Sequence, residues 1–165
     1  MVHLLFQNTI RFITLLLIQV LVLNNIQFLG FINPYIYILA VISLPVKMPR
    51  WMSLLAAFGL GVTIDMFTNT LGLHAFACVL VAFLRNPLIT FFTTNEDNVN
   101  FTPSFRTFGV APYIKFVVLL VLIHHFTLYY MEVFSFKHFL ITAYRAGLSS
   151  LITISIILAW RLLRK

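Results

Sequence analysis

Three ionisable residues lie inside or beside long apolar runs of this 165-residue chain, where charge is costly: Asp65, His74 and Arg145. A carboxylate, an imidazole and a guanidinium that met could move protons, hold a ligand or form an ion pair. A charge at membrane depth costs a few kcal/mol or more, so such residues usually face protein or water. The positions of these three side chains therefore bear most directly on function.

Helical rise predicts that the three residues converge. At about 1.5 Å per residue, Asp65 lies roughly 21 Å from Trp51, in the outer half of its span. The tight connection 69–72 follows, so His74 begins the next helix at nearly the same level. Arg145 lies about 12 Å below the outer surface on a descending helix. We expect one polar layer drawn from three spans.

Periodicity adds a direction to this layer. Ala57, Gly61 and Asp65 repeat every four residues and share one helix face, where small side chains let another helix approach closely. Asp65 should therefore point into the bundle. On the last span, Arg145 and Ser149 belong to a polar stripe of the same spacing. We expect an ion pair between Asp65 and Arg145.

Two interpretations of the layer stay open, a polar clasp that holds helices together and a ligand site. Polar contacts between membrane helices contribute only about 0.6–2 kcal/mol each. Gln19, midway along the first apolar run, has the same two interpretations, since it could contact another helix or face a partner, as could Ser149. An intramembrane enzyme that uses Asp65 and His74 as acid and base lacks an accompanying nucleophile or metal site.

The remaining chemical candidates are weak. Adjacent side chains on a helix diverge by about 100°, so His124 and His125 cannot both face one ion. No Ser-His-Asp, Cys-His or phosphate-loop pattern occurs, and the single Cys78 is expected to pack in an apolar run. We expect no catalytic residue, no bound metal and no cofactor.

Composition predicts an integral membrane protein. Hydrophobic residues make up 61% of the chain and charged residues 9%, and the mean hydropathy is +1.01. A soluble domain of this length needs far more charge on its surface. The net charge of +7 comes mainly from Lys and Arg at the ends of apolar runs, which sets orientation and does not indicate nucleic-acid binding.

The apolar runs predict an all-α bundle of about six transmembrane helices in a single domain, 1–165. The expected spans are 9–29, 31–46, 51–68, 71–92, 113–131 and 139–160, with a polar cytoplasmic loop at 93–112. The second run is short and bracketed by Pro34 and Pro45, so it either crosses fully or is re-entrant. Pro87 should break the fourth helix and leave 88–92 at the interface.

The distribution of basic residues favours six spans with both termini in the cytoplasm, since the outer loops then hold only Lys137. Aromatic residues near span ends match an interfacial belt: Trp51, Trp160, Tyr35, Tyr37, Tyr113, Tyr129 and Tyr130.

The run 61–75, GVTIDMFTNTLGLHA, resembles the signature of the rod shape-determining protein MreD family. That signature is an apolar helix with Gly, then Asp, a small polar turn and Leu-Gly. The Asn33-Pro34 entry to a short second span, the basic turn at 47–50, the basic C-terminal tail and the overall length are also similar. On this resemblance, the residues expected to serve helix packing and the family motif are Ala57, Gly59, Gly61, Leu71 and Gly72.

The resemblance implies a non-enzymatic scaffold of the cell-elongation machinery in the bacterial inner membrane. Its implied partners are an MreC-like bitopic protein, RodA with a class B penicillin-binding protein, an MreB-like cytoskeleton indirectly, and membrane lipid; a homodimer is left open. The implied fold resembles the substrate-binding subunits of energy-coupling-factor transporters. A solute- or lipid-binding transporter subunit is therefore the alternative function, and the loop 93–112 departs from common family members by its length.

Overall fold

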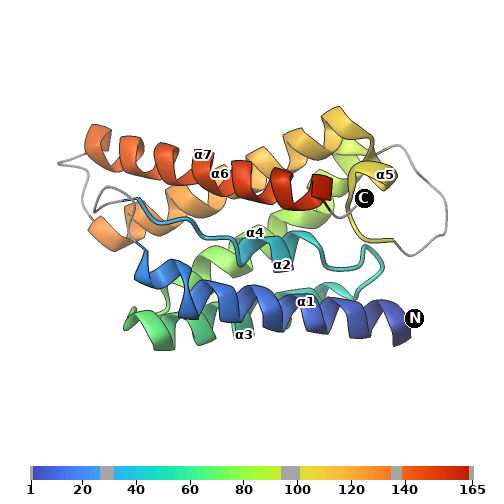
Figure 1. The fold of residues 1–165 in the computed structure, drawn as a ribbon, viewed down its shortest axis with the longest axis horizontal. Coiled ribbons are helices and arrows are strands. Elements are labelled where there is room, and N and C mark those ends of the chain that lie inside the picture. The colour runs from blue at the N-terminus through green and yellow to red at the C-terminus, as the bar shows by residue number, and fades with distance from the viewer. Residues whose placement is uncertain (1, 27–31, 94–100, 135–138, 164–165) are drawn as a thin grey trace.

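The computed structural model describes residues 2–26, 32–93, 101–134 and 139–163. The regular secondary structure of these residues is helical (Figure 1). The helices are α1 Val2–Leu21, η1 Leu23–Asn25, α2 Ile38–Ile42, α3 Arg50–Thr68, α4 Leu73–Phe92, α5 Phe105–Phe108, α6 Val110–Val133 and α7 Phe139–Leu163. The acidic part of the polar loop (Glu96 and Asp97), Lys137 and the last two basic residues lie outside the described residues.

Five helices are long and apolar enough to cross a membrane, namely α1 with η1, α3, α4, α6 and α7. The chain is therefore a helical membrane protein, as its composition predicts. The fourth expected span is one continuous helix to Phe92, so Pro87 does not end it and 88–92 is not a separate segment. A proline removes one backbone hydrogen bond, which a long packed helix tolerates.

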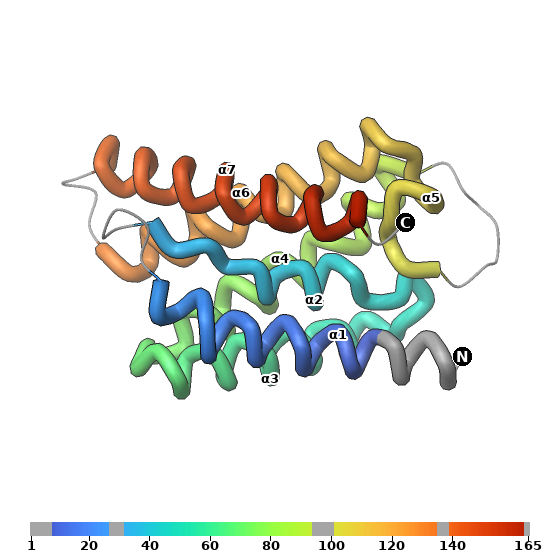
Figure 2. Tube along the Cα trace, in the orientation of Figure 1, coloured from blue at the N-terminus to red at the C-terminus, as the bar shows by residue number. Residues whose placement is uncertain are grey.

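The helices form layers around a central segment. α1 and α3 lie on one side, α6 and α7 lie on the other, and α4 runs obliquely between them together with segment 32–49 (Figure 1, Figure 2). Both termini and α5 lie at one end of the molecule, which we call the terminal end. The α3–α4 turn lies at the opposite end, which we call the turn end.

Segment 32–49 differs most from the helix expected at 31–46. Its only helix is the five-residue α2, yet residues 34–45 are buried without exception. The segment runs from the turn end, where α1 finishes, to the terminal end, where α3 begins (Figure 2). The central crossing of the bundle is thus a mostly unwound chain.

Candidate functional site

Asp65 holds the start of α4. Its Oδ1 accepts hydrogen bonds from the Thr70 hydroxyl at 2.5 Å and the His74 backbone N–H at 3.0 Å, and its Oδ2 accepts from the Ala75 N–H at 2.9 Å. The first N–H groups of a helix have no partner within the helix and carry partial positive charge. The carboxylate therefore caps α4 across the turn, and the predicted adjacency of Asp65 and His74 arises through the His74 backbone.

The turn between α3 and α4 depends on two residues whose backbone is in the left-handed conformation. Asn69 ends α3 with φ 54° and Gly72 precedes α4 with φ 82°. Asparagine and glycine are the residues that adopt this conformation most readily. Leu71, expected to serve the motif by packing, is instead 100% exposed at the tip of the turn. Its place in the motif is not explained by contacts within this chain.

The expected ion pair between Asp65 and Arg145 is not formed. Both carboxylate oxygens of Asp65 are engaged at α4, and no carboxylate lies within salt-bridge distance of Arg145 among the described residues. The Arg145 guanidinium instead lies 5.6 Å from the centroid of the Tyr129 ring, and its Nε is buried without a hydrogen-bond partner. Helical rise placed the two residues at a similar depth but could not show which helices are neighbours.

The small-residue face of α3 packs against α4. Ala57, Gly61 and Asp65 are all buried. A Cβ at Gly61 would come within 2.3 Å of the Ala75 Cα, so only glycine permits this approach. Gly59 does not share the contact, since a Cβ there would meet no atom within 4 Å. Gly59 faces away from α4 and does not serve packing within the chain.

Polar side chains of α1 and α7 bind the unwound backbone. The Gln19 side chain donates to the Pro34 carbonyl at 3.1 Å and accepts from the Ile36 N–H at 2.9 Å. The Ser149 and Thr153 hydroxyls accept from the backbone N–H groups of Asn33 and Tyr35, at 3.3 and 3.1 Å. Irregular backbone is tolerated at membrane depth only where protein or water supplies such partners. Gln19 and Ser149 therefore make internal contacts, the first of the two interpretations left open above.

Arg85 also binds the backbone of segment 32–49, at its other end. It is fully buried, and it donates to the carbonyls of Ile42 (3.4 Å) and Leu44. Backbone carbonyls at a helix C-terminus carry partial negative charge, which a guanidinium stabilises. The sequence pattern does not single out Arg85, which counts there only among the basic residues that orient the spans. The apolar neighbours of Arg85 on α4 are the signal that could have identified its role.

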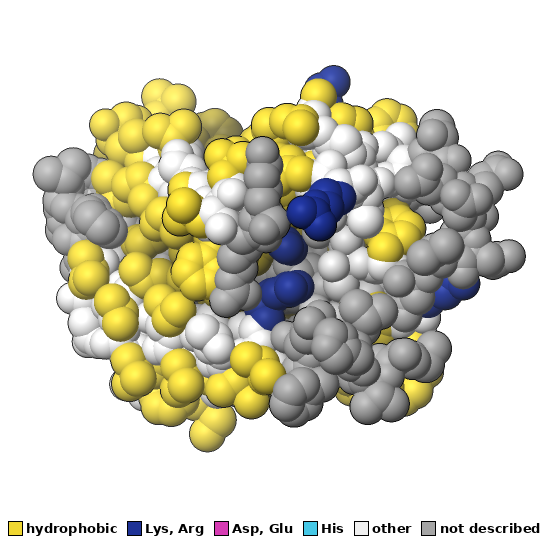
Figure 3. Space-filling model, turned by 45° about the vertical axis from the view of Figure 1, so that its right-hand side comes forward, with side chains coloured by type: hydrophobic (Ala, Val, Ile, Leu, Met, Phe, Trp, Pro, Cys, Tyr) yellow, Lys and Arg dark blue, Asp and Glu magenta, His cyan; other side chains and the backbone are white. Residues whose placement is uncertain are grey.

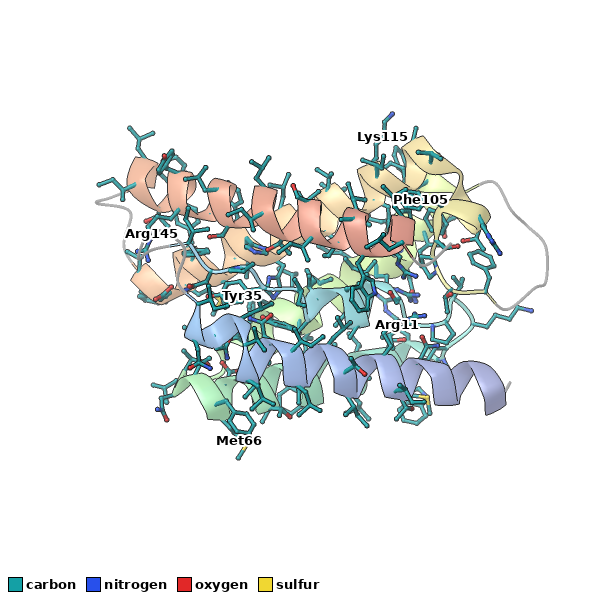
Figure 4. All side chains as sticks on the ribbon, in the orientation of Figure 1. Arg11, Tyr35, Met66, Phe105, Lys115 and Arg145 are labelled. Carbon is teal, nitrogen blue, oxygen red and sulfur yellow. The ribbon has the colours of Figure 1, made fainter. Side chains whose placement is uncertain are left out.

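Three histidines meet at two tyrosines of the unwound segment. The Tyr37 hydroxyl lies 2.7 Å from His74 Nδ1 and 2.9 Å from His124 Nε2. The Tyr35 ring, central in Figure 4, lies 5.3–6.1 Å from the rings of all three, the third being His125. Because the hydroxyl has one proton, it donates to one of His74 and His124 and accepts from the other.

Three tyrosines expected in an interfacial belt lie in this core instead: Tyr35, Tyr37 and Tyr129. Tyr35 and Tyr37 belong to the unwound segment that fills the centre, and the Tyr129 hydroxyl meets the Ser149 hydroxyl at 2.8 Å. Tyr113 is also buried, against Arg161 at the terminal end. Proximity to the end of an apolar run therefore does not establish an interfacial position.

His124 and His125 are both buried but bond to different partners. His125 Nδ1 donates to the Val121 carbonyl at 3.0 Å, and its Nε2 lies 3.1 Å from the Thr153 hydroxyl. The Val121 carbonyl can only accept, so Nε2 of neutral His125 is an acceptor; the single proton of the Thr153 hydroxyl points either to this nitrogen or to the Ser149 carbonyl 2.8 Å away. In the described part of the chain, no group of three or more His, Cys, Asp or Glu side chains is arranged so that it could hold a metal ion.

A cavity and a groove formed by described residues lie outside this core. A cavity of about 400 Å³ opens at the turn end, and His74 is among its lining residues. An apolar groove of about 480 Å³ lies between α1 and α3 towards the terminal end, and Gly59 is among its lining residues. Of the three residues predicted to form one polar layer, His74 lines this cavity, and Asp65 and Arg145 do not.

Comparisons with protein-family models, with curated proteins and with solved structures give no match for this chain.

Proposed function

We propose that this chain is a non-enzymatic membrane scaffold whose α1–α3 groove receives the transmembrane helix of a bitopic partner. The observation that carries the proposal is an unfilled strip of small residues on α3, Ala56, Gly59 and Thr63, which lies in the groove. Helices associate in membranes by close backbone approach at such strips. Among the described residues, no atom lies within 4 Å of a Cβ placed at Gly59.

The identity of the partner rests on the resemblance of residues 61–75 to the MreD signature. We take the partner to be an MreC-like bitopic protein and the setting to be the cell-elongation machinery of the bacterial inner membrane. RodA, a class B penicillin-binding protein and an MreB-like cytoskeleton complete that assembly. The polar residues that first suggested acid–base chemistry make internal hydrogen bonds, which supports a structural role for them.

The proposed topology has six crossings with both termini cytoplasmic. Five are long helices and the sixth is segment 32–49, which runs between opposite ends of the bundle (Figure 2). In Figure 3, which turns the terminal end towards the viewer, several Lys and Arg side chains lie close together near the centre of the face, with hydrophobic side chains mainly to their left and above. Basic residues concentrate on the cytoplasmic side of bacterial membrane proteins. Such a bundle resembles the substrate-binding subunits of energy-coupling-factor transporters in its number of spans.

The test is partner capture by a groove variant. Gly59→Leu should fill the groove without disturbing the fold, because no atom lies within 4 Å of the new Cβ. Co-purification of the MreC-like protein in mild detergent should fall at least about tenfold, equivalent to about 1.4 kcal/mol. Gly147→Leu is the matched control, since Gly147 on α7 has equal space around it. Equal capture by both variants would contradict the proposed docking site, and no capture by the wild type would contradict the proposed partner.

A further inference from the structure

The cavity at the turn end has a lining that excludes some ligands and suits others. It is formed by η1, the start of segment 32–49, the α3–α4 turn and α6, and the residues that matter here are Asn33, Tyr35, Phe67, His74 and Glu132. Its volume of about 400 Å³ is near the lower end of the range for small-molecule sites. The ligand is therefore small.

Charge and aromatic surface favour a cation. Glu132 is the one charged side chain among the described lining residues, which include no Lys or Arg. Tyr35 and Phe67 contribute ring surface. A carboxylate with aromatic faces is a combination that binds organic ammonium groups, by charge and by cation–π attraction. An anion would meet only repulsion from Glu132.

The imidazole of His74 favours a ligand that also carries a hydroxyl. His74 is only 3% exposed, and its Nδ1 is taken by the Tyr37 hydroxyl. Its Nε2 has no hydrogen-bond partner among the described residues, although the residue lines the cavity. This nitrogen is therefore available to a ligand in the cavity, and a hydroxyl can either donate to it or accept from it.

The geometry points to a binding site for a small hydroxylated organic cation of the choline or ethanolamine type. The ammonium group lies by Glu132 and the rings of Tyr35 and Phe67, and the hydroxyl bonds to His74 Nε2. A free solute offers both the ammonium group and the hydroxyl. The headgroup of a lipid in the adjacent leaflet offers the same ammonium group with a phosphate ester oxygen in place of the hydroxyl, and this oxygen can only accept a hydrogen bond from His74 Nε2. The site is independent of the scaffold function, because the cavity and the α1–α3 groove share no lining residue.

The test uses the full chain in phosphatidylglycerol nanodiscs, with choline and its uncharged isostere 3,3-dimethylbutan-1-ol as probes. Choline should raise the unfolding temperature saturably, because a ligand that binds only the folded state stabilises it, and the isostere should not. Glu132→Gln should weaken choline binding at least about tenfold. Phe67→Leu should weaken it, whereas Phe58→Leu, a change of another exposed phenylalanine on the same helix (52% against 62% exposed), should leave it unchanged.

Nanodiscs that contain phosphatidylcholine distinguish a free solute from a lipid headgroup as the ligand of the cavity. Loss of the choline effect in these discs identifies the lipid headgroup as the occupant, and a retained effect identifies a free solute. Equal stabilisation by the isostere, an undiminished effect in Glu132→Gln, or no stabilisation by choline in phosphatidylglycerol discs would overturn the proposal. The partner-capture test with Gly59→Leu does not depend on any of these results.

Discussion

Asp65 shows how a buried charge can be stabilised without a counter-ion. Its carboxylate receives one hydroxyl and two backbone N–H groups, and the two N–H groups carry the positive end of the α4 dipole. Hydrogen bonds to a charged group contribute about 1.5–3 kcal/mol each, about twice as much as neutral ones. The residue is a helix cap whose function is to fix the α3–α4 hairpin.

Asp65→Asn should therefore destabilise the protein even though it keeps the size of the side chain. An amide has one acceptor oxygen, and its NH₂ group would face an N–H donor of α4. We expect a loss of roughly 1–3 kcal/mol in the free energy of unfolding, measured by reversible denaturation in detergent. Thr68→Ser is a control at the same turn, because it keeps the hydroxyl that bonds to the Ile64 carbonyl. A variant as stable as the wild type would rule out the capping role.

The absence of an Asp65–Arg145 pair gives a second residue-scale prediction. Residues that do not touch and share no partner behave additively, within about 0.3–0.5 kcal/mol. The losses of stability in Asp65→Asn and Arg145→Met should therefore sum in the double variant. A coupling energy of 1 kcal/mol or more in this double-mutant cycle would show that the two side chains interact after all.

At the scale of elements, α3 and α4 depend on a contact that only glycine allows. Gly61→Ala places a methyl group within 2.3 Å of the Ala75 backbone, which cannot move aside without parting the helices. We expect most of the folded, monodisperse protein to be lost, measured by yield after detergent extraction and by unfolding temperature. Gly147→Ala, which meets no atom within 4 Å, should be tolerated. Similar behaviour of the two variants would contradict the close α3–α4 packing.

Side chains of α1, α4 and α7 bind the backbone of segment 32–49. Removing one of these side chains should therefore make local opening of the segment more frequent. Gln19→Leu keeps the bulk of the side chain but leaves the Ile36 N–H and the Pro34 carbonyl without partners. Each unsatisfied group costs about 1–3 kcal/mol, which favours local opening. Hydrogen–deuterium exchange of the segment should accelerate at least about tenfold. Thr14→Val, which removes a bond within α1 only, should not change it.

The long helices were predictable and the unwound segment was not, for a physical reason. Apolar length identifies α3 and α7 because a membrane helix satisfies its own backbone. The run 31–46 is as apolar as a helix, but its backbone partners come from residues distant in the chain, such as Gln19 and Thr153. The sequence singled out Gln19, Asp65 and Ser149 as polar residues within apolar runs but left open whether they make internal contacts or bind a ligand or partner. It paired Asp65 with the wrong group, because the sequence does not show which helices are neighbours.

At the scale of the whole molecule, the two concave sites lie towards opposite ends of one bundle. The apolar groove between α1 and α3 suits a helix, and the polar cavity at the turn end suits a small solute. Segment 32–49 connects the two regions, since Tyr35 lines the cavity and Leu44 lines the groove. Each proposed site therefore includes residues of this segment, which runs between the two ends of the bundle.

Thiol labelling in intact cells tests that crossing most directly. The variants are Asn25→Cys, before the segment, Leu71→Cys, at the α3–α4 turn, and Lys47→Cys, after the segment; all three positions are exposed. The wild type, whose only cysteine is the buried Cys78, is the unlabelled control. A membrane-impermeant maleimide should label Asn25→Cys and Leu71→Cys in intact cells, and Lys47→Cys only after permeabilisation. Labelling of Asn25→Cys and Lys47→Cys from the same side would show that the segment does not cross.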